Sequence, residues 1–162
     1  DLLGGSPADA ATRAKIGVVF EDAFFYESFT AAQVARSLAG MYGARWNADS
    51  FSAYLRRFGL DAGKKLKEYS RGMRLKLSLA AALAHDPELL VLDEACAACK
   101  NDLVEEDLLR EAAARAEQEA EVVLTGREPA AWMQDAADYS TELRAVKHPY
   151  TRGIAAREGV EY

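Results

Sequence analysis

The chain has 162 residues, of which 50% are hydrophobic and 28% charged, with a formal net charge of −6. These values are typical of one folded domain and exclude a disordered or low-complexity protein, because disorder requires a lower apolar content. The apolar run at 77–84 is far shorter than the roughly 20 residues that cross a bilayer, so we expect no membrane span.

Charge is divided unevenly along the chain. Residues 1–81 hold 12 Lys and Arg against 8 Asp and Glu, whereas residues 82–162 hold 8 against 18. The basic residues of the first half alternate with apolar ones at helical spacing, which is typical of solvated helix faces and not of a nucleic-acid-binding tail. We therefore expect no nucleic-acid partner. The opening at Asp1, without a Met, indicates an excised or truncated segment.

The first half of the sequence predicts one strand followed by three helices. The apolar, β-branched stretch at 16–20 is typical of a buried strand. Apolar residues at helical spacing, with Thr30 and Ser70 as candidate N-caps, then predict helices over 30–42, 49–58 and 70–84.

The second half alternates strands and helices. Strands are predicted at 89–92 and 121–125 and a last one at 141–143, with helices over 104–118 and through Trp132. Helices alternating with short apolar strands predict an α/β fold with a mainly parallel sheet.

The strand at 89–92 is followed by Asp93-Glu94, which is the strongest candidate in the sequence for a metal-binding or catalytic site. An aspartate at the carboxyl end of a strand can hold Mg²⁺ through water, and the adjacent glutamate can orient an attacking water, as in a Walker B motif. The alternative is a pair of acids that cap the next helix.

A second candidate site precedes this strand by about twenty residues. In Ser70-Arg71-Gly72, at the start of the helix over 70–84, a hydroxyl and backbone N–H groups could face a phosphate. The alternative is an ordinary N-cap followed by a glycine.

Residues 15–95 resemble the ATP-binding subunit of ABC transporters. The segment KIGVVFEDAFFYESFT is similar to the strand and Q-loop, with Glu21 in place of the glutamine, and YSRGMRLKLSLAAALAHDPELLVLDEA is similar to the signature motif, its helix and Walker B. The resemblance implies a P-loop NTPase-like fold with a helical insertion at about 30–85. It also implies a cytoplasmic protein, at the inner face of the membrane, whose partners are a permease and a second ATP-binding subunit.

The same resemblance implies a role for each site residue. Ser70, Arg71 and Gly72 would contact ATP held by the second subunit, and Glu21, in the place of the Q-loop glutamine, would be a further nucleotide-binding residue. Asp93 and Glu94 would bind Mg²⁺, and Glu94 would also be the catalytic carboxylate.

Residues 88–162 resemble a different family, the ATP:corrinoid adenosyltransferases of cobalamin synthesis. The matching segments are ELLVLDEACAA and the run from EVVLTGREP to the closing GVEY. This resemblance implies ATP, Mg²⁺ and a corrinoid substrate, with Asp93 and Glu94 again as metal and phosphate ligands. The chain therefore resembles a chimera, with an ABC-like segment at 1–94 and a transferase-like segment at 88–162 in one compact unit.

No G-x-x-x-x-G-K-[ST] loop occurs in the sequence, so the lysine and backbone nest that cradle ATP phosphates are absent from it. The leading hypothesis is therefore an ABC-type element that completes a nucleotide site in trans and is inactive alone. The alternatives are a corrinoid adenosyltransferase and an inactive P-loop segment.

Two further features have ordinary interpretations. Cys96 and Cys99 have the spacing of a redox motif, but two reduced thiols in a cytoplasmic protein are the simpler hypothesis. The aromatic cluster at 20–29 is either core or, if part of it is exposed, a docking face for the membrane partner.

Overall fold

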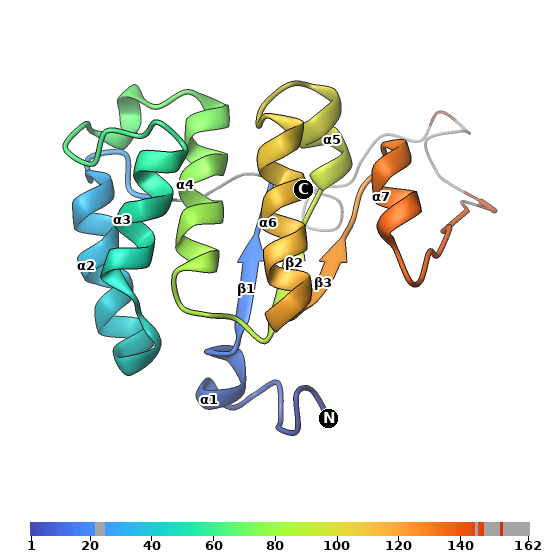
Figure 1. Ribbon diagram of the computed structural model, residues 1–162, viewed down its shortest axis with the longest axis horizontal. Coiled ribbons are helices and arrows are strands. Elements are labelled where there is room, and N and C mark those ends of the chain that lie inside the picture. Colours follow the sequence, from blue (N-terminus) through green and yellow to red (C-terminus); the bar gives the residue numbers. More distant parts are fainter. Residues whose placement is uncertain (22–24, 145, 148–152, 154–162) are drawn as a thin grey trace.

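A computed structural model describes residues 1–21, 25–144, 146–147 and 153, with the backbone alone at 115–119. The chain is an α/β protein built on a parallel sheet, as predicted (Figure 1). Its elements in chain order are α1 (Ala10–Arg13), β1 (Ile16–Val19), α2 (Ala31–Tyr42), a 3-10 turn (Gly43–Arg45), α3 (Ala48–Arg57), a second 3-10 turn (Leu66–Glu68), α4 (Arg71–Leu83), β2 (Leu89–Leu92), α5 (Ala95–Lys100), α6 (Glu106–Glu119), β3 (Glu121–Leu124) and α7 (Ala131–Ala136).

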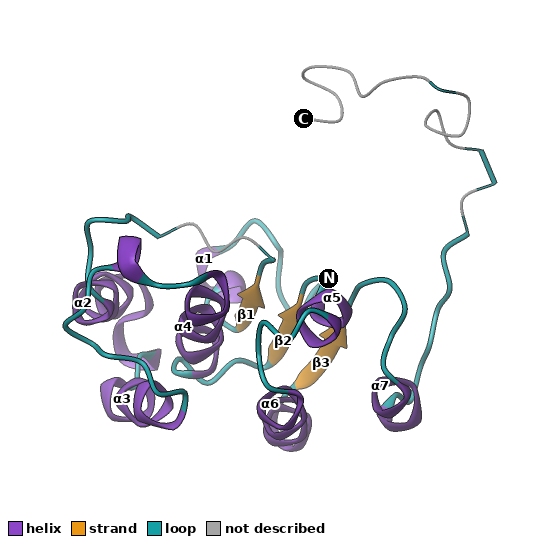
Figure 2. Cartoon of the chain, turned by 90° about the horizontal axis from the view of Figure 1, so that it is seen from above, coloured by secondary structure: helices purple, strands orange, loops and turns teal. Residues whose placement is uncertain are grey.

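The described strands lie in the order β1-β2-β3, and both pairs are parallel. In register, Ile16 lies opposite Leu89, which lies opposite Glu121. Helices α4 and α6 pack on one face of this sheet, and the loops that follow the three strands gather at one edge (Figures 1 and 2). The carboxyl ends of all three strands therefore meet where α/β proteins bind their ligands.

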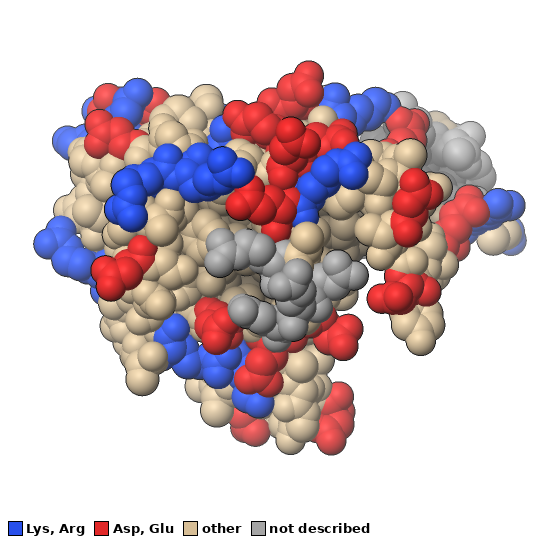
Figure 3. All heavy atoms as spheres, in the orientation of Figure 1, with Lys and Arg blue, Asp and Glu red and all other residues tan. Residues whose placement is uncertain are grey.

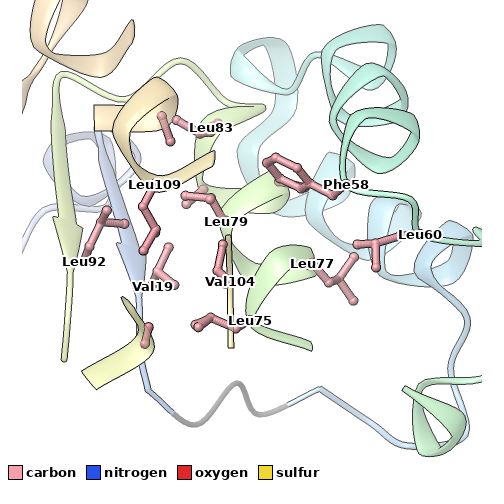
Figure 4. Close-up of a cluster of buried hydrophobic side chains, with 14 of the residues drawn as sticks. Val19, Phe58, Leu60, Leu75, Leu77, Leu79, Leu83, Leu92, Val104 and Leu109 are labelled. Carbon is pink, nitrogen blue, oxygen red and sulfur yellow. The ribbon is translucent and has the colours of Figure 1, made fainter. Parts of the chain in front are cut away.

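The hydrophobic core lies between the sheet and its helices (Figure 4). Alternate strand residues point into it, because side chains of a strand alternate between its two faces. Val19, Leu90 and Leu92 are at most 4% exposed and pack with residues such as Leu79 of α4 and Leu109 of α6. This alternation fixes which face of the sheet the helices cover.

The predicted helical insertion at about 30–85 is present as α2, α3 and α4, which pack on one another. Thr30 begins α2 with a capping box, in which its side chain accepts from the Gln33 N–H and its own N–H donates to Gln33 Oε1. Asn47 caps α3 in the simpler way, accepting from the Ser50 N–H at 2.8 Å. Each helix thus begins where its side chains satisfy the free N–H groups.

One prediction of secondary structure was wrong and one helix was not predicted. The predicted helix over 104–118 is present as α6, which begins at Glu106, whereas the Ala-rich segment with Cys96 and Cys99 forms a separate short helix, α5, that the sequence pattern did not predict. The predicted strand at 141–143 is absent, and Leu143 there is 94% exposed. A strand requires a neighbour to pair with, and β3 is the last strand in the order of the described residues.

None of the helices in the described part of the chain is long and apolar enough to span a membrane. The helix-covered side of the molecule carries blue, basic side chains mainly over its α3 and α4 part, and red, acidic ones mainly over the centre and the α7 side (Figure 3). The uneven charge of the sequence is therefore also uneven in space.

Candidate functional site

Asp93 lies at the carboxyl edge of the sheet, directly after β2. Its N–H donates to the Val19 carbonyl at 2.8 Å, which fixes the start of the loop against the neighbouring strand. The Thr125 hydroxyl, directly after β3, donates to Asp93 Oδ1 at 2.8 Å. The first bond therefore fixes the Asp93 backbone against β1, and the second orients its carboxylate from the end of β3.

Glu94 is held by the same threonine. Its N–H donates to Thr125 Oγ1 at 3.0 Å, so the hydroxyl accepts from one acidic residue and donates to the other. The Glu94 backbone is left-handed, with φ 51°, which turns the chain sharply from β2 into α5. Left-handed backbone is uncommon outside glycine and is found at functional turns.

Thr125 is a functional candidate that the sequence analysis missed. The sequence does contain a signal for it, because the next predicted strand after Asp93, at 121–125, ends in this threonine. Parallel strands have their carboxyl ends at the same edge of the sheet, so the threonine is expected on the same edge as Asp93. What the sequence could not give was the order of the strands, which places β3 directly beside β2.

The start of α4 lies at the same edge, and an ion pair joins it to the segment directly after β1. Ser70 caps the helix by accepting from the Met73 N–H at 3.2 Å. Arg71 Nη2 lies 2.6 Å from Glu21 Oε1, and both side chains are about half exposed. The structure therefore brings together Glu21 and the 70–72 segment, which the sequence had named separately as nucleotide contacts.

Gly72 is required by close packing. A Cβ placed on it would lie 2.2 Å from the Leu103 carbonyl oxygen, in the loop between α5 and α6. The ion pair of Lys76 with Glu105, at 2.6 Å between Nζ and Oε2, ties the same loop to α4. The loop after α5 thus rests on the first turn of α4, so α5 and this loop connect the acidic pair to the start of α4.

Replacing Gly72 with alanine is expected to lower the free energy of unfolding by about 1–3 kcal/mol, because the new methyl must push a backbone carbonyl aside. Gly40 is a matched control in α2, since a Cβ there meets nothing within 4 Å. Gly40→Ala should raise stability by up to about 1 kcal/mol. Chemical denaturation of the two variants measures the difference, and equal stabilities would contradict the packing argument.

The donors at this edge suit magnesium that is shared with a nucleotide. Among the described residues, no group of three or more His, Cys, Asp or Glu side chains could hold a metal ion by itself. Mg²⁺ is usually held by one or two carboxylates together with waters and phosphate oxygens. Asp93, oriented by Thr125, fits that role and leaves the remaining positions to the nucleotide and water.

The two cysteines do not have the properties of a redox pair. Burial raises the pKa of the Cys96 thiol, and burial together with the Glu106 carboxylate raises that of Cys99. A reactive cysteine requires the opposite shift, since the thiolate is the nucleophile. Both thiols are free, and Cys96 packs against Met133, so the structure favours ordinary reduced thiols.

The aromatic cluster is divided between core and surface. Phe25 and Phe29 pack against the core, whereas Phe20 is 58% and Tyr26 76% exposed. Phe24, the remaining member of the cluster, lies outside the described residues. Two exposed rings of the cluster therefore lie close in sequence to Glu21, and the Tyr26 ring contacts Phe29 at 5.2 Å between centroids.

A groove of about 750 Å³ lies at the opposite, amino edge of the sheet, beside Trp46 and Tyr54. The Arg45 guanidinium lines it, but it donates to the Asp86 carbonyl at 2.7 Å and pairs with Glu88 at 3.6 Å. Arg45 Nε, by contrast, is buried without a hydrogen-bond partner. The groove lies at the opposite edge of the sheet from the acidic pair, which remains the candidate site because it carries the oriented carboxylate.

Comparisons with known proteins point to two families. The model of the family ATP:corrinoid adenosyltransferase BtuR/CobO/CobP matches residues 44–162. A corrinoid adenosyltransferase of Pseudomonas aeruginosa is 42% identical over 87 residues, which are 52% of this chain and 42% of that protein. An uncharacterized ABC transporter ATP-binding protein of Synechocystis is 31% identical over 99 residues, which are 57% of this chain and 28% of that protein. The chain therefore spans less than half the length of these relatives, and both resemblances stated from the sequence are confirmed.

Solved structures agree on the fold. An ATP-binding subunit of an ABC transporter has a TM-score of 0.58 at 20% identity, over 72% of this chain and 50% of its own. A putative ABC transporter ATP-binding protein from Pyrococcus furiosus has a TM-score of 0.59 at 22% identity, over 80% of this chain and 65% of its own. At these identities the likeness establishes the P-loop NTPase-like fold alone, and it extends over only part of the solved domains.

Proposed function

The chain belongs to the ATP:corrinoid adenosyltransferase family BtuR/CobO/CobP, and from its site and its two sets of relatives we propose that it supplies one side of an ATP site that is completed in trans. In this proposal it acts as the ATP-binding element of an ABC-type transporter, in the cytoplasm at the inner face of the membrane. The observation that carries the proposal is the arrangement at the carboxyl edge, where Thr125 orients Asp93 and the loop after α5 rests on the start of α4, in a sequence that has no G-x-x-x-x-G-K-[ST] loop.

Each site residue has a role in this proposal. The Ser70 hydroxyl and the N–H groups at the start of α4 face the phosphates of a nucleotide held by a second subunit, because the positive end of a helix attracts anions. Arg71 adds positive charge there, and Glu21 positions it. Gly72 lets the neighbouring loop approach.

Asp93 would hold magnesium through water, and Glu94 would orient the water that attacks the terminal phosphate. When bound, magnesium would neutralise charge on the phosphate oxygens. Thr125 fixes the Asp93 carboxylate and the Glu94 backbone together, so it would be a positioning residue for both. The exposed rings of Phe20 and Tyr26 support a docking face for a permease next to this site.

The proposal is tested by binding of a fluorescent, slowly hydrolysed ATP analogue with magnesium to the Synechocystis ABC-type relative, with and without this chain. We expect the chain to tighten binding, and Asp93→Asn to weaken this effect by about tenfold or more, since a charge-assisted contact is worth about 1.5–3 kcal/mol. Asp135→Asn, a change on the exposed surface of α7, is the control and should have no effect. Unchanged binding in the presence of the chain would refute the proposal.

A second function, adenosyl transfer from ATP to a corrinoid, is favoured by the family match over 44–162. It places the same carboxylates, Asp93 and Glu94, on magnesium and phosphate. The assay is formation of adenosylcobalamin from cob(I)alamin and Mg-ATP, followed by absorbance. Absence of product at an excess of the chain would exclude this function for the chain alone.

A further inference from the structure

The loop between α3 and α4 carries three lysines whose charge is not matched within the chain. Lys65 and Lys67 are exposed and Lys64 is half-buried. Their side chains form no ion pair or hydrogen bond within the part of the chain that the structure describes. By contrast, Arg57 and Arg74 nearby in the sequence both pair with glutamates. Unmatched positive charge is therefore concentrated on this loop, on the basic side of the molecule (Figure 3), although the protein as a whole has a net charge of −6.

Backbone hydrogen bonds fix this loop against the segment before α2. The Leu66 N–H donates to the Phe29 carbonyl at 2.8 Å, and the Lys67 N–H donates to the Glu27 carbonyl at 2.9 Å. Leu66 is 1% exposed, so it anchors the loop in the core while the lysines before and after it stay in solvent. The lysines are therefore presented on a fixed surface.

An exposed aromatic ring lies on the same surface. Tyr26 is 76% exposed, and its ring rests on that of Phe29 at 5.2 Å between centroids. Because the Phe29 backbone is bonded to Leu66, Tyr26 lies beside the lysine loop. Tyrosine is enriched at the interface between membrane and water, since its ring is apolar and its hydroxyl polar.

The carboxylates around this surface do not cancel its positive charge. Glu27 is taken by Arg74 at 3.2 Å, which leaves Asp61 and Glu68 as the acidic residues of the loop itself. Arg56, at the end of α3, adds a fourth cation without a partner among the described residues. Three of the four cations are lysines, whose mobile point charges suit a fluid array of headgroups. Recognition of fixed carboxylates on a protein favours the planar fork of arginine.

We propose that Lys64, Lys65, Lys67 and Tyr26 bind the surface of an anionic lipid membrane. The lysines contact the acidic headgroups, and the tyrosine ring lies among them. So few cations bind such a surface weakly, so the contact orients the chain at a membrane and does not anchor it. Tyr26 also borders the docking face proposed for a permease, which lies in a membrane, so both contacts can form on one side of the chain. The inference goes beyond the proposed function, because neither nucleotide nor a second subunit takes part in it.

The test is sedimentation of the full chain with vesicles of phosphatidylcholine alone or of phosphatidylcholine with phosphatidylserine, at low and at high salt, without nucleotide. We expect binding only to the anionic vesicles and only at low salt. Changing Lys65 and Lys67 together to Gln should weaken it about tenfold or more. Tyr26→Ala should weaken it a few-fold without changing the salt dependence. The matched control changes Arg36 and Arg127 to Gln, which removes the same charge from two exposed positions elsewhere and should leave binding unchanged.

Two results would overturn the inference directly: equal binding to neutral and anionic vesicles, and an equal loss in the lysine and arginine double variants. Polyglutamate provides a third test, because it is a soluble polyanion without a membrane interface. If it binds as tightly as anionic vesicles of equal charge, and Tyr26→Ala changes neither, the surface fits an acidic protein segment and not a membrane. Thermal unfolding checks that each variant is folded. Vesicle binding needs no nucleotide, so its failure and the failure of the proposed trans site are separate results.

Discussion

Leu90→Ala is expected to lower the free energy of unfolding by about 2–5 kcal/mol, which is a large part of the stability of a domain of this size. Leu90 is 0% exposed at the centre of the middle strand, opposite Gly17 on one side and Val122 on the other. Removing three carbons leaves a cavity that the paired backbones on both sides cannot close, so the loss includes the lost packing as well as the transfer term.

Leu143→Ala is the matched control for this prediction, because it makes the same chemical change at a residue that is 94% exposed. We expect it to change stability by no more than about 0.5 kcal/mol. Urea denaturation followed by circular dichroism compares the two variants. Similar losses in both would mean that β2 is not the centre of the core.

The strands at 16–19 and 89–92 could be predicted because they are short apolar runs between turn signals. The helices over the insertion could be predicted because caps and apolar spacing agree there, as at Thr30 and Ser70. The strand at 141–143 has the same kind of local signal, but pairing with a neighbour decides whether a strand forms, and no local pattern reports it.

The candidate site could be predicted only in part for a related reason. Asp93 and Glu94 could be identified from the local sequence alone, because they are two acidic residues directly after a short apolar strand. Thr125 acquires its meaning only from the strand order, and the contact of Gly72 with Leu103 joins segments about thirty residues apart. Long-range packing of this kind depends on the whole fold, so residue types and spacings could name the parts of the site but not the contacts that join them.

Acid is expected to destabilise the protein through His85, which is 1% exposed between α4 and β1. Its two ring nitrogens lie 3.2 Å from the carbonyl oxygens of Ala81 and Ile16, and its ring stacks on Tyr42 at 4.1 Å between centroids. Burial lowers the pKa of this imidazole below its ordinary value of 6.5, the nearby Arg45 acts in the same direction, and the two carbonyls and Asp86 oppose the shift.

The sign of the effect follows from proton binding. Below pH 6.5 the unfolded chain binds a proton at this residue, whereas the folded chain resists it, so stability is fully present above 6.5 and is lost as pH falls from there toward the folded pKa. The loss is at most about 1.4 kcal/mol per pH unit. The carboxylates whose pKa is lowered, such as Glu105, act only below their ordinary value of 4.5, so within the described residues the interval between about 5 and 6.5 isolates His85.

His85→Gln removes the titrating group but keeps an N–H donor for one of the two carbonyls. The variant should be less stable than wild type at every pH, and its stability should depend less on pH between about 5 and 6.5, where an ordinary histidine begins to bind a proton. Urea midpoints across that interval measure the slope for both proteins. The slope decides the matter, because a purely structural role for the ring would shift the midpoints equally at all pH values. If wild type and His85→Gln have parallel profiles, the buried imidazole is not the source of the acid sensitivity.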